Sequence, residues 1–226
     1  MKGIWNKYKR EFVVLIATLA MCVVFTVLNK NFLNYSNFLT ILQQMVLNGV
    51  LAVGMMFTII TGGIDLSVGC TYAITGIVVA SCTVNYGMNP FLAILVGIVI
   101  GAVLGAFNGF LVAKLNIQPM VATLILYTAG RGIAQLITDG QITYIRVGSY
   151  KVYGGYIGKC PVPTPIFIAI IVVVITYLVL KKTALGLYIE SVGINGTASR
   201  LVGLNSTMIK FLTYVICGVL AGIAGI

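Results

Sequence analysis

The chain has 226 residues, of which 60% are hydrophobic and only 8% are charged, and its formal net charge is +10. Soluble domains carry charge on about a quarter of their residues, so this composition excludes one and predicts an integral membrane protein. There is no His and there are only four acidic residues, which nearly excludes metal-dependent hydrolysis and His-based catalysis.

Seven hydrophobic segments predict an all-α fold, a polytopic helix bundle in the membrane. They cover residues 12–28, 38–61, 66–84, 91–113, 120–138, 165–180 and the stretch from 211 to the chain end. The first follows a basic N-terminus without a convincing signal-peptide cleavage site, so we interpret it as an uncleaved helix. The third is of marginal length, which leaves two interpretations open: a full span, or a half-helix or re-entrant segment. We expect one transmembrane domain over residues 1–226, truncated before its C-terminal helices.

Two polar features interrupt the second and third segments. Gln44 and Asn48 lie one helical turn apart and form a small patch, either for hydrogen bonds between helices or for substrate contact. The string TGGIDLSVG at 61–69 then breaks the hydrophobic run. Its glycines permit a helix break, and Asp65 is placed to cap the next helix by accepting from the amides of Ser67 or Val68. A half-helix start inside a bundle also suits substrate contact, so both roles stay open for Asp65.

The segment 91–113 has a small residue at every fourth position. These residues are Ala93, Gly97, Gly101, Gly105, Gly109 and Ala113. Small side chains in such a row let a second helix backbone approach closely. The stripe therefore predicts a helix that is buried in the bundle and packs through Gly97, Gly101, Gly105 and Gly109.

The segment 120–138 carries a polar face. Thr128, Arg131, Gln135 and Thr138 recur at intervals of three and four, which places them on one side of a helix. An arginine near the bilayer centre costs at least about 2.5 kcal/mol unless water or a partner accommodates it. We expect this face to line a cavity, the alternative being that Arg131 reaches the outer headgroups. The candidates for a translocation path are thus Gln44, Asn48, Asp65, Arg131 and Gln135.

Two connections are long enough to dock partners, one on each side of the membrane. The connection 139–164 contains YKVYGGYIG and PVPTP, which predict a turn-rich hairpin and a rigid helix entry. The connection 181–210 lies on the opposite side. With the N-terminus in the cytoplasm, nine basic residues fall inside and four outside, as the positive-inside rule requires. The basic residues are dispersed among apolar runs, which argues against a nucleic-acid partner.

The string TGGIDLSVG, with QQMVLNGVLAVGM before it, resembles the signature of the inner-membrane permeases of bacterial ABC sugar importers, the ribose and xylose type. The similarity continues through GFLVAKLNIQPMVATL, RGIAQLITDGQ, VPTP and TALGLYIESVGINGTASRLVGLN, so it covers nearly the whole chain. The resemblance identifies the family and leaves the sugar open.

The resemblance implies a channel of two permease copies, identical or different, in the bacterial cytoplasmic membrane. Cytoplasmic ATP-binding subunits and an extracytoplasmic sugar-binding protein would complete the assembly. The loop 193–203 would carry a short coupling helix for the ATPase, through Gly193, Asn195, Ala198, Arg200, Leu201 and Gly203. Gly196 and Thr197 stand where the family commonly has Glu-Ala, which puts the coupling strength or the choice of ATPase in doubt.

The leading hypothesis is therefore a channel subunit of an ATP-driven monosaccharide importer that is itself no enzyme and binds no cofactor. No G-x-x-x-x-G-K-[ST] loop is present, so ATP must bind to another chain. An ion- or proton-coupled secondary transporter is the alternative, although Asp65 is its one plausible intramembrane carboxylate. A non-transporting membrane scaffold is a third hypothesis.

Overall fold

The computed structural model describes residues 2–141, 154–156 and 162–226, with side chains from residue 11 onward. Most of the connection predicted as a hairpin, including Arg146, Lys151 and Lys159, lies outside the described residues. Within the described part, Tyr156 and Pro163 form an isolated antiparallel bridge. The chain divides into two compact units, Met1–Gln44 and Met45–Ile226, and the boundary falls inside a helix.

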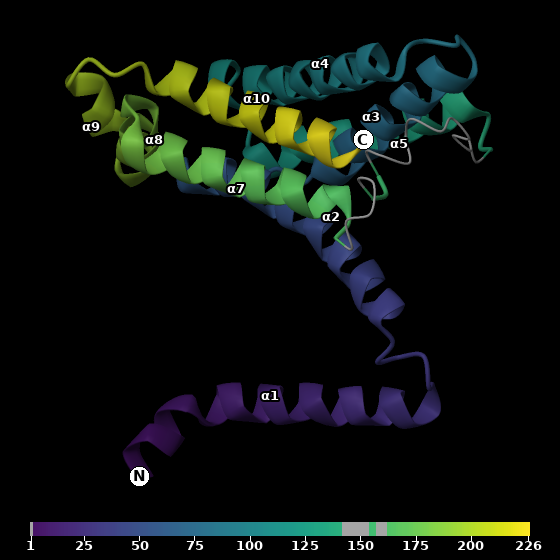
Figure 1. Ribbon diagram of the computed structural model, residues 1–226. Helices are drawn as coiled ribbons and strands as arrows, with labels where there is room; N and C mark the ends of the chain where they lie inside the picture. The colour runs from purple at the N-terminus through teal and green to yellow at the C-terminus, as the bar shows by residue number, and fades with distance from the viewer. Residues whose placement is uncertain (1, 142–153, 157–161) are drawn as a thin grey trace. The chain divides into compact units, whose positions relative to one another are not determined.

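Helices make up nearly all of the described chain (Figure 1). The first unit contains α1 and the start of α2, and the second unit contains the rest. Their bounds are α1 Lys2–Leu28, α2 Tyr35–Ile60, α3 Val68–Val84, α4 Pro90–Gly109 with a π-helical turn η1 Phe110–Lys114, α5 Pro119–Thr138, α7 Thr164–Lys182, α8 Ala184–Ile194, α9 Gly196–Leu201 and α10 Ser206–Ala224. The predicted all-α membrane fold is confirmed.

Six of these helices are long and apolar enough to cross a membrane: α1, α2, α4 with η1, α5, α7 and α10. The third predicted segment is α3, which has only 17 residues, so its marginal length is confirmed. The connection expected over 181–210 is largely helical: α8 follows α7 after one residue, and α9 follows α8 after one residue. Its apolar sequence, ALGLYIESVGI, explains why it packs as a helix against the bundle.

Helix starts in the second unit follow local sequence signals. Asn89 precedes α4, and its side chain accepts a hydrogen bond from the Phe91 amide at 2.9 Å, with Pro90 in the first turn. Asn205 caps α10 in the same way through the Met208 amide at 3.0 Å. These asparagines define where the spans begin.

The stripe of small residues on α4 packs against α10, and this is the most extensive helix pair of the second unit (Figure 1). A methyl group on Gly105 would collide with the Tyr214 carbonyl oxygen, and one on Gly101 would lie 2.5 Å from the Gly218 carbonyl oxygen. In return, a methyl group on Gly218 would collide with the carbonyl oxygen of Gly101. The predicted close approach of two backbones is therefore confirmed.

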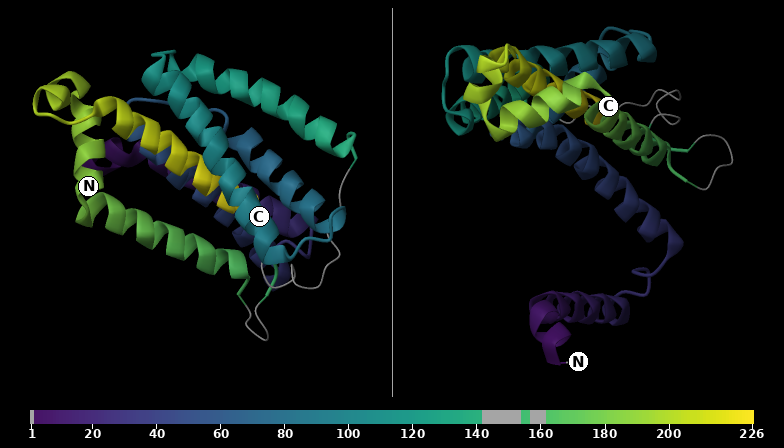
Figure 2. Two further views of the ribbon diagram at one scale, coloured as in Figure 1. Left: turned by 90° about the horizontal axis from the view of Figure 1, so that it is seen from above. Right: turned by 90° about the vertical axis from the view of Figure 1, so that its left-hand side faces the viewer.

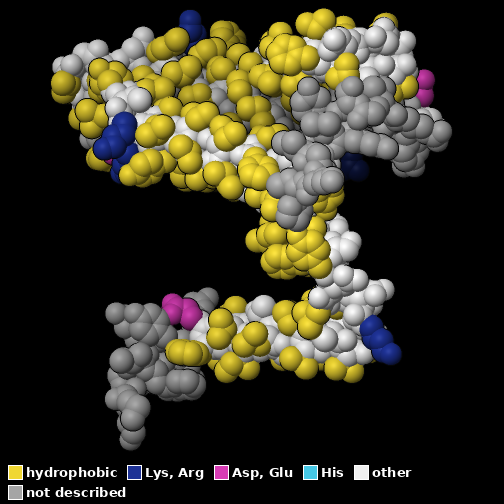
Figure 3. Space-filling model, viewed as in Figure 1, with side chains coloured by type: hydrophobic (Ala, Val, Ile, Leu, Met, Phe, Trp, Pro, Cys, Tyr) yellow, Lys and Arg dark blue, Asp and Glu magenta, His cyan; other side chains and the backbone are white. Residues whose placement is uncertain are grey.

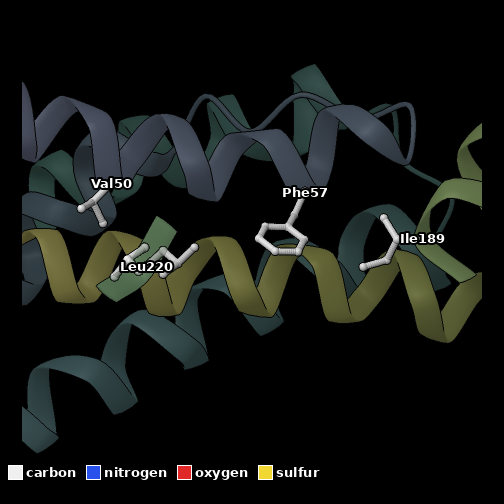
Figure 4. Packing of buried hydrophobic residues seen from close by; sticks show 5 residues of the cluster. Val50, Phe57, Ile189 and Leu220 are labelled. Carbon is white, nitrogen blue, oxygen red and sulfur yellow. The ribbon is translucent and has the colours of Figure 1, made fainter. Parts of the chain in front are cut away.

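Helix α10 is the central element of the second unit. It contacts α3, α4, η1, α8 and α9, and Figure 2 shows it between α5 on one side and α7 on the other. An apolar core lies where α2, α8 and α10 meet, with Phe57 between Leu220 on one side and Ile189 on the other (Figure 4). This core ties the short α8 to two membrane-spanning helices.

The outer faces of the helices are apolar, as lipid contact requires. Val99 and Val103 of α4 and Ile171 and Ile175 of α7 are all more than half exposed. Hydrophobic side chains cover most of the visible surface of each unit in Figure 3, and Lys and Arg side chains appear only in isolated places.

We expect Gly218→Val to destabilise the protein by about 1–3 kcal/mol, because a larger side chain must separate two packed backbones. Thermal unfolding of the purified protein in detergent measures the effect. Gly132→Val is the matched control, since nothing lies within 4 Å of a side chain at that glycine of α5. Equal stability of the two variants would contradict the packing described here.

Candidate functional site

The break between α2 and α3 is built by its two glycines. Gly62 has a φ of +79°, which suits glycine, and its amide donates to the Ile59 carbonyl oxygen at 2.9 Å. The Gly63 amide donates to the Thr58 carbonyl oxygen at 2.9 Å. These bonds end α2 as a helix C-terminus commonly ends, and they turn the chain toward Asp65.

Asp65 is buried at this break and is held by hydrogen bonds. Its Oδ1 accepts from the Ser67 amide at 2.9 Å and from the Ser67 hydroxyl at 2.6 Å. The predicted bond from the Ser67 amide is thus present. The prediction was wrong in one respect: Ser67, not Asp65, is the N-cap residue, and α3 begins at Val68.

Asn108 of α4 joins this carboxylate to the rest of the bundle. Its Nδ2 donates to the Ser67 hydroxyl oxygen at 2.7 Å and lies 3.5 Å from Asp65 Oδ1. All three residues are at most 2% exposed, so the cluster is shielded from solvent. We call Asp65, Ser67 and Asn108 the break cluster.

Residues of α5 and α10 complete the surroundings of the break cluster. The hydroxyls of Thr61 and Thr213 are 3.3 Å apart, and the Thr123 hydroxyl lies 3.5 Å from the Ile64 carbonyl oxygen. The thiol of Cys217 faces the Asp65 carboxyl group. Residues of α2, α4, α5 and α10 therefore lie together at the break.

Sequence reasoning missed Asn108, Thr213 and Tyr214 as parts of this region. A signal was available for Asn108, because it is the one side-chain amide in the apolar run of α4. Tyr214 and Thr213 carry no such signal, since their proximity to the break depends on how α10 packs against α4.

The polar face of α5 lies at the surface of the second unit. Thr128, Arg131 and Gln135 are exposed, and Thr138 is half-buried. Arg131 and Tyr127 border a cleft of about 310 Å³ between α3 and α5, which is otherwise lined by Gly69, Cys70, Ala73, Gly130 and Ala134. These small residues leave room beside the guanidinium group.

The candidates for a translocation path occupy two kinds of environment. Asp65 is buried in the break cluster, whereas Asn48, Arg131 and Gln135 are exposed on their helices. Gln44 is also exposed, but it belongs to the first unit. The cleft brings Arg131 next to the first turn of α3, and Asp65 precedes that same helix.

The loop expected to carry a short helix does carry one, α9. Asn195 caps it by accepting from the Thr197 and Ala198 amides at 3.1 and 3.0 Å. Gly196 is its first residue, where low helix propensity matters least, and its carbonyl oxygen accepts from the Ser206 hydroxyl at 2.8 Å. Arg200 donates to the Thr207 hydroxyl at 3.3 Å. The elbow formed by residues 193–205 is thus tied to the start of α10.

The elbow presents an apolar surface. Ile194, Leu201 and Val202 are 87%, 86% and 83% exposed, which is unusual for side chains at a helix end in a polar loop. Exposed apolar groups of this kind mark contact surfaces. Gly203 ends the helix with a φ of +90°, a conformation that favours glycine.

Gly193 joins the elbow to the break. A methyl group at this position would collide with the carbonyl oxygen of Ile60, the last residue of α2. The absence of a side chain therefore lets the end of α8 pack directly on the end of α2, one residue before the TGGIDLSVG string.

Comparison with known proteins places these features in a family. A family model described as "branched-chain amino acid transport system / permease component" matches residues 37–226. The chain belongs to this permease family. Both the break and the elbow lie within the matched part of the permease. No solved structure gives a significant match.

Several curated relatives of this permease are sugar permeases by name. The galactofuranose transporter permease of Escherichia coli K12 is 46% identical over 177 residues, 78% of this chain and 51% of the relative. The ribose import permease of the same strain is 39% identical over 215 residues, 94% of this chain and 67% of the relative. The fructose import permease of Bifidobacterium longum is 40% identical over 194 residues, which are 83% of this chain and 53% of the relative. The chain thus spans about half to two thirds of these relatives' length.

We expect Asp65→Ala to destabilise the permease by about 1–3 kcal/mol, because the buried hydrogen-bond donors of Ser67 and Asn108 lose their acceptor. Asp65→Asn keeps one acceptor oxygen, so this variant should lose clearly less stability than Asp65→Ala. Thermal unfolding in detergent separates the two variants. A loss of stability that is the same for both would show that the negative charge, and not hydrogen bonding, determines the role of Asp65.

Proposed function

We propose that the full-length protein is the membrane-spanning subunit of an ATP-driven importer for a monosaccharide. The observation that carries the proposal is the elbow, a capped short helix with three exposed apolar side chains, in a chain of this permease family. Relatives named for ribose, galactofuranose and fructose import support the sugar class. The chain itself would perform no chemistry.

The elbow would dock a separate cytoplasmic ATP-binding subunit. Leu201 and Val202, with Ile194, offer apolar anchors, and Arg200 adds a cation beside them. A few side chains usually contribute most of the affinity at a protein interface, and arginine is common among them. With the N-terminus in the bacterial cytoplasm, α9 would lie on the cytoplasmic side of the membrane, where ATP is available. The distribution of basic residues favours this orientation as well.

The assembly would also need a second permease copy, identical or different, and an extracytoplasmic sugar-binding protein. Exposed polar groups on α5 support a wet path within that assembly, since Arg131 and Gln135 facing lipid would be costly. Closure of the ATPase would move the elbow and switch the channel between its two access states. Discrimination among sugars would begin at the binding protein.

Replacing Arg200 and Leu201 with Ala should lower sugar uptake at least about tenfold, because the loss of interface anchors weakens docking by about 1.4 kcal/mol or more. Uptake and ATP hydrolysis are measured together for the full-length protein and its ATPase in proteoliposomes. Leu136→Ala is the control, because Leu136 is 79% exposed at the far end of α5 from the elbow. Normal uptake by the double variant would contradict the docking role.

Arg131→Ala should lower uptake about tenfold or more while the ATPase still binds, because a hydrogen bond from a charged group contributes about 1.5–3 kcal/mol. Thr128→Val is a matched control on the same exposed face, since the Thr128 hydroxyl bonds to the Leu124 and Ile125 carbonyl oxygens of its own helix at 3.0 Å.

The energy source of uptake separates this proposal from a secondary transporter. Uptake that collapses with the proton gradient at constant ATP would favour the secondary transporter.

A further inference from the structure

Two buried polar atoms beside the break cluster have no hydrogen-bond partner among the described residues. They are Asn108 Oδ1 and the Tyr214 hydroxyl, on side chains that are 0% and 1% exposed. An unsatisfied buried polar group costs about 1–3 kcal/mol, so two of them near one carboxylate need an explanation.

The orientation of the Asn108 amide follows from its neighbours. The Ser67 hydroxyl has a single hydrogen, which it donates to Asp65 Oδ1 at 2.6 Å. It must therefore accept from Asn108, whose nitrogen lies 2.7 Å away. The carbonyl oxygen of Asn108 is then directed away from Ser67 and requires a donor from elsewhere.

Both unsatisfied atoms belong to side chains that contact the short segment around Asp65. Asn108 contacts Ser67, two residues after Asp65, and the Tyr214 hydroxyl lies against Gly63, two residues before it. The bonds that Asp65 accepts from Ser67 and Asn108 all go to Oδ1. The Cys217 thiol is a further donor beside the Asp65 carboxyl group.

No cationic side chain neutralises this site within the described residues, where Lys181 and Glu190 form the one ion pair. The unsatisfied groups are one hydroxyl that can donate and one amide oxygen that can accept. Water matches both, because it can accept from the hydroxyl and donate to the oxygen. Buried waters in proteins typically make about three bonds to polar groups that lack other partners.

We infer that one structural water binds beside the break cluster, where it accepts from the Tyr214 hydroxyl and donates to Asn108 Oδ1. The water joins α4 to α10 next to the α2–α3 break. The site is independent of the proposed transport function, because it requires only the fold of the second unit.

The sign of one substitution tests the inference. If the Tyr214 hydroxyl has no partner, Tyr214→Phe removes an unsatisfied group and raises the thermal midpoint. If it binds the water, Tyr214→Phe lowers the midpoint, by about 2–4 °C for a chain of this size. The intact chain is measured in detergent, with Tyr177→Phe as the control, because Tyr177 is 58% exposed on α7. An unchanged or raised midpoint for Tyr214→Phe overturns the inference.

Two further measurements identify the bound species. Tyr214→Phe and Asn108→Leu should be non-additive when combined, because both remove partners of the same water; additive losses overturn the inference. The midpoint of the unsubstituted protein should be equal in sodium chloride and choline chloride. A higher midpoint in sodium chloride alone would assign the site to a sodium ion and overturn the assignment of water.

Discussion

The close contact between α4 and α10 is the constraint on which the rest of the second unit depends. Because glycines on both helices remove the side chains from the contact, the two backbones approach until carbonyl oxygens lie against the opposing α-carbons. This approach places Asn108, on the buried side of α4, and Tyr214, on α10, at the level of the chain break. A wider separation of the helices would leave the buried carboxylate of Asp65 with its own loop as its only support.

Apart from the short helix within 193–203, which the family resemblance implied, hydrophobicity and spacing were sufficient to predict the helices, the stripe at Gly97–Gly109 and the Ser67 bond to Asp65. Each depends on neighbours within a few residues, which a sequence displays directly. The parts that were missed depend on contacts between distant segments. The contribution of Asn108 requires knowing which helix faces the break, and α8 was taken for part of a loop because 11 residues are too few to span a membrane. The assignment of Asp65, Arg131 and the other polar residues to a path stays a prediction.

The contact of Gly193 with the end of α2 connects the two features of the chain that most suggest function. On one side of it lies the exposed elbow, and on the other lies the break with its buried polar cluster. The apolar core formed by Phe57, Ile189 and Leu220 holds α8 against α2 and α10 (Figure 4). A displacement of the elbow would therefore reach the break through packed backbone, since tightly packed elements transmit strain and do not absorb it.

The π-helical turn η1 affects the geometry of the glycine seam. In an α-helix, four residues advance about 40° beyond a full turn, so a row of every fourth residue winds gradually away from a straight partner. A π turn closes its hydrogen bonds over five residues, as from Leu115 to Phe110, and four residues then make less than one full turn. The winding is reversed at this point, and Val112 and Ala113 remain buried at the end of the helix. One widened turn thus offsets part of the accumulated rotation, and Val112 and Ala113 continue the buried side of α4 into η1.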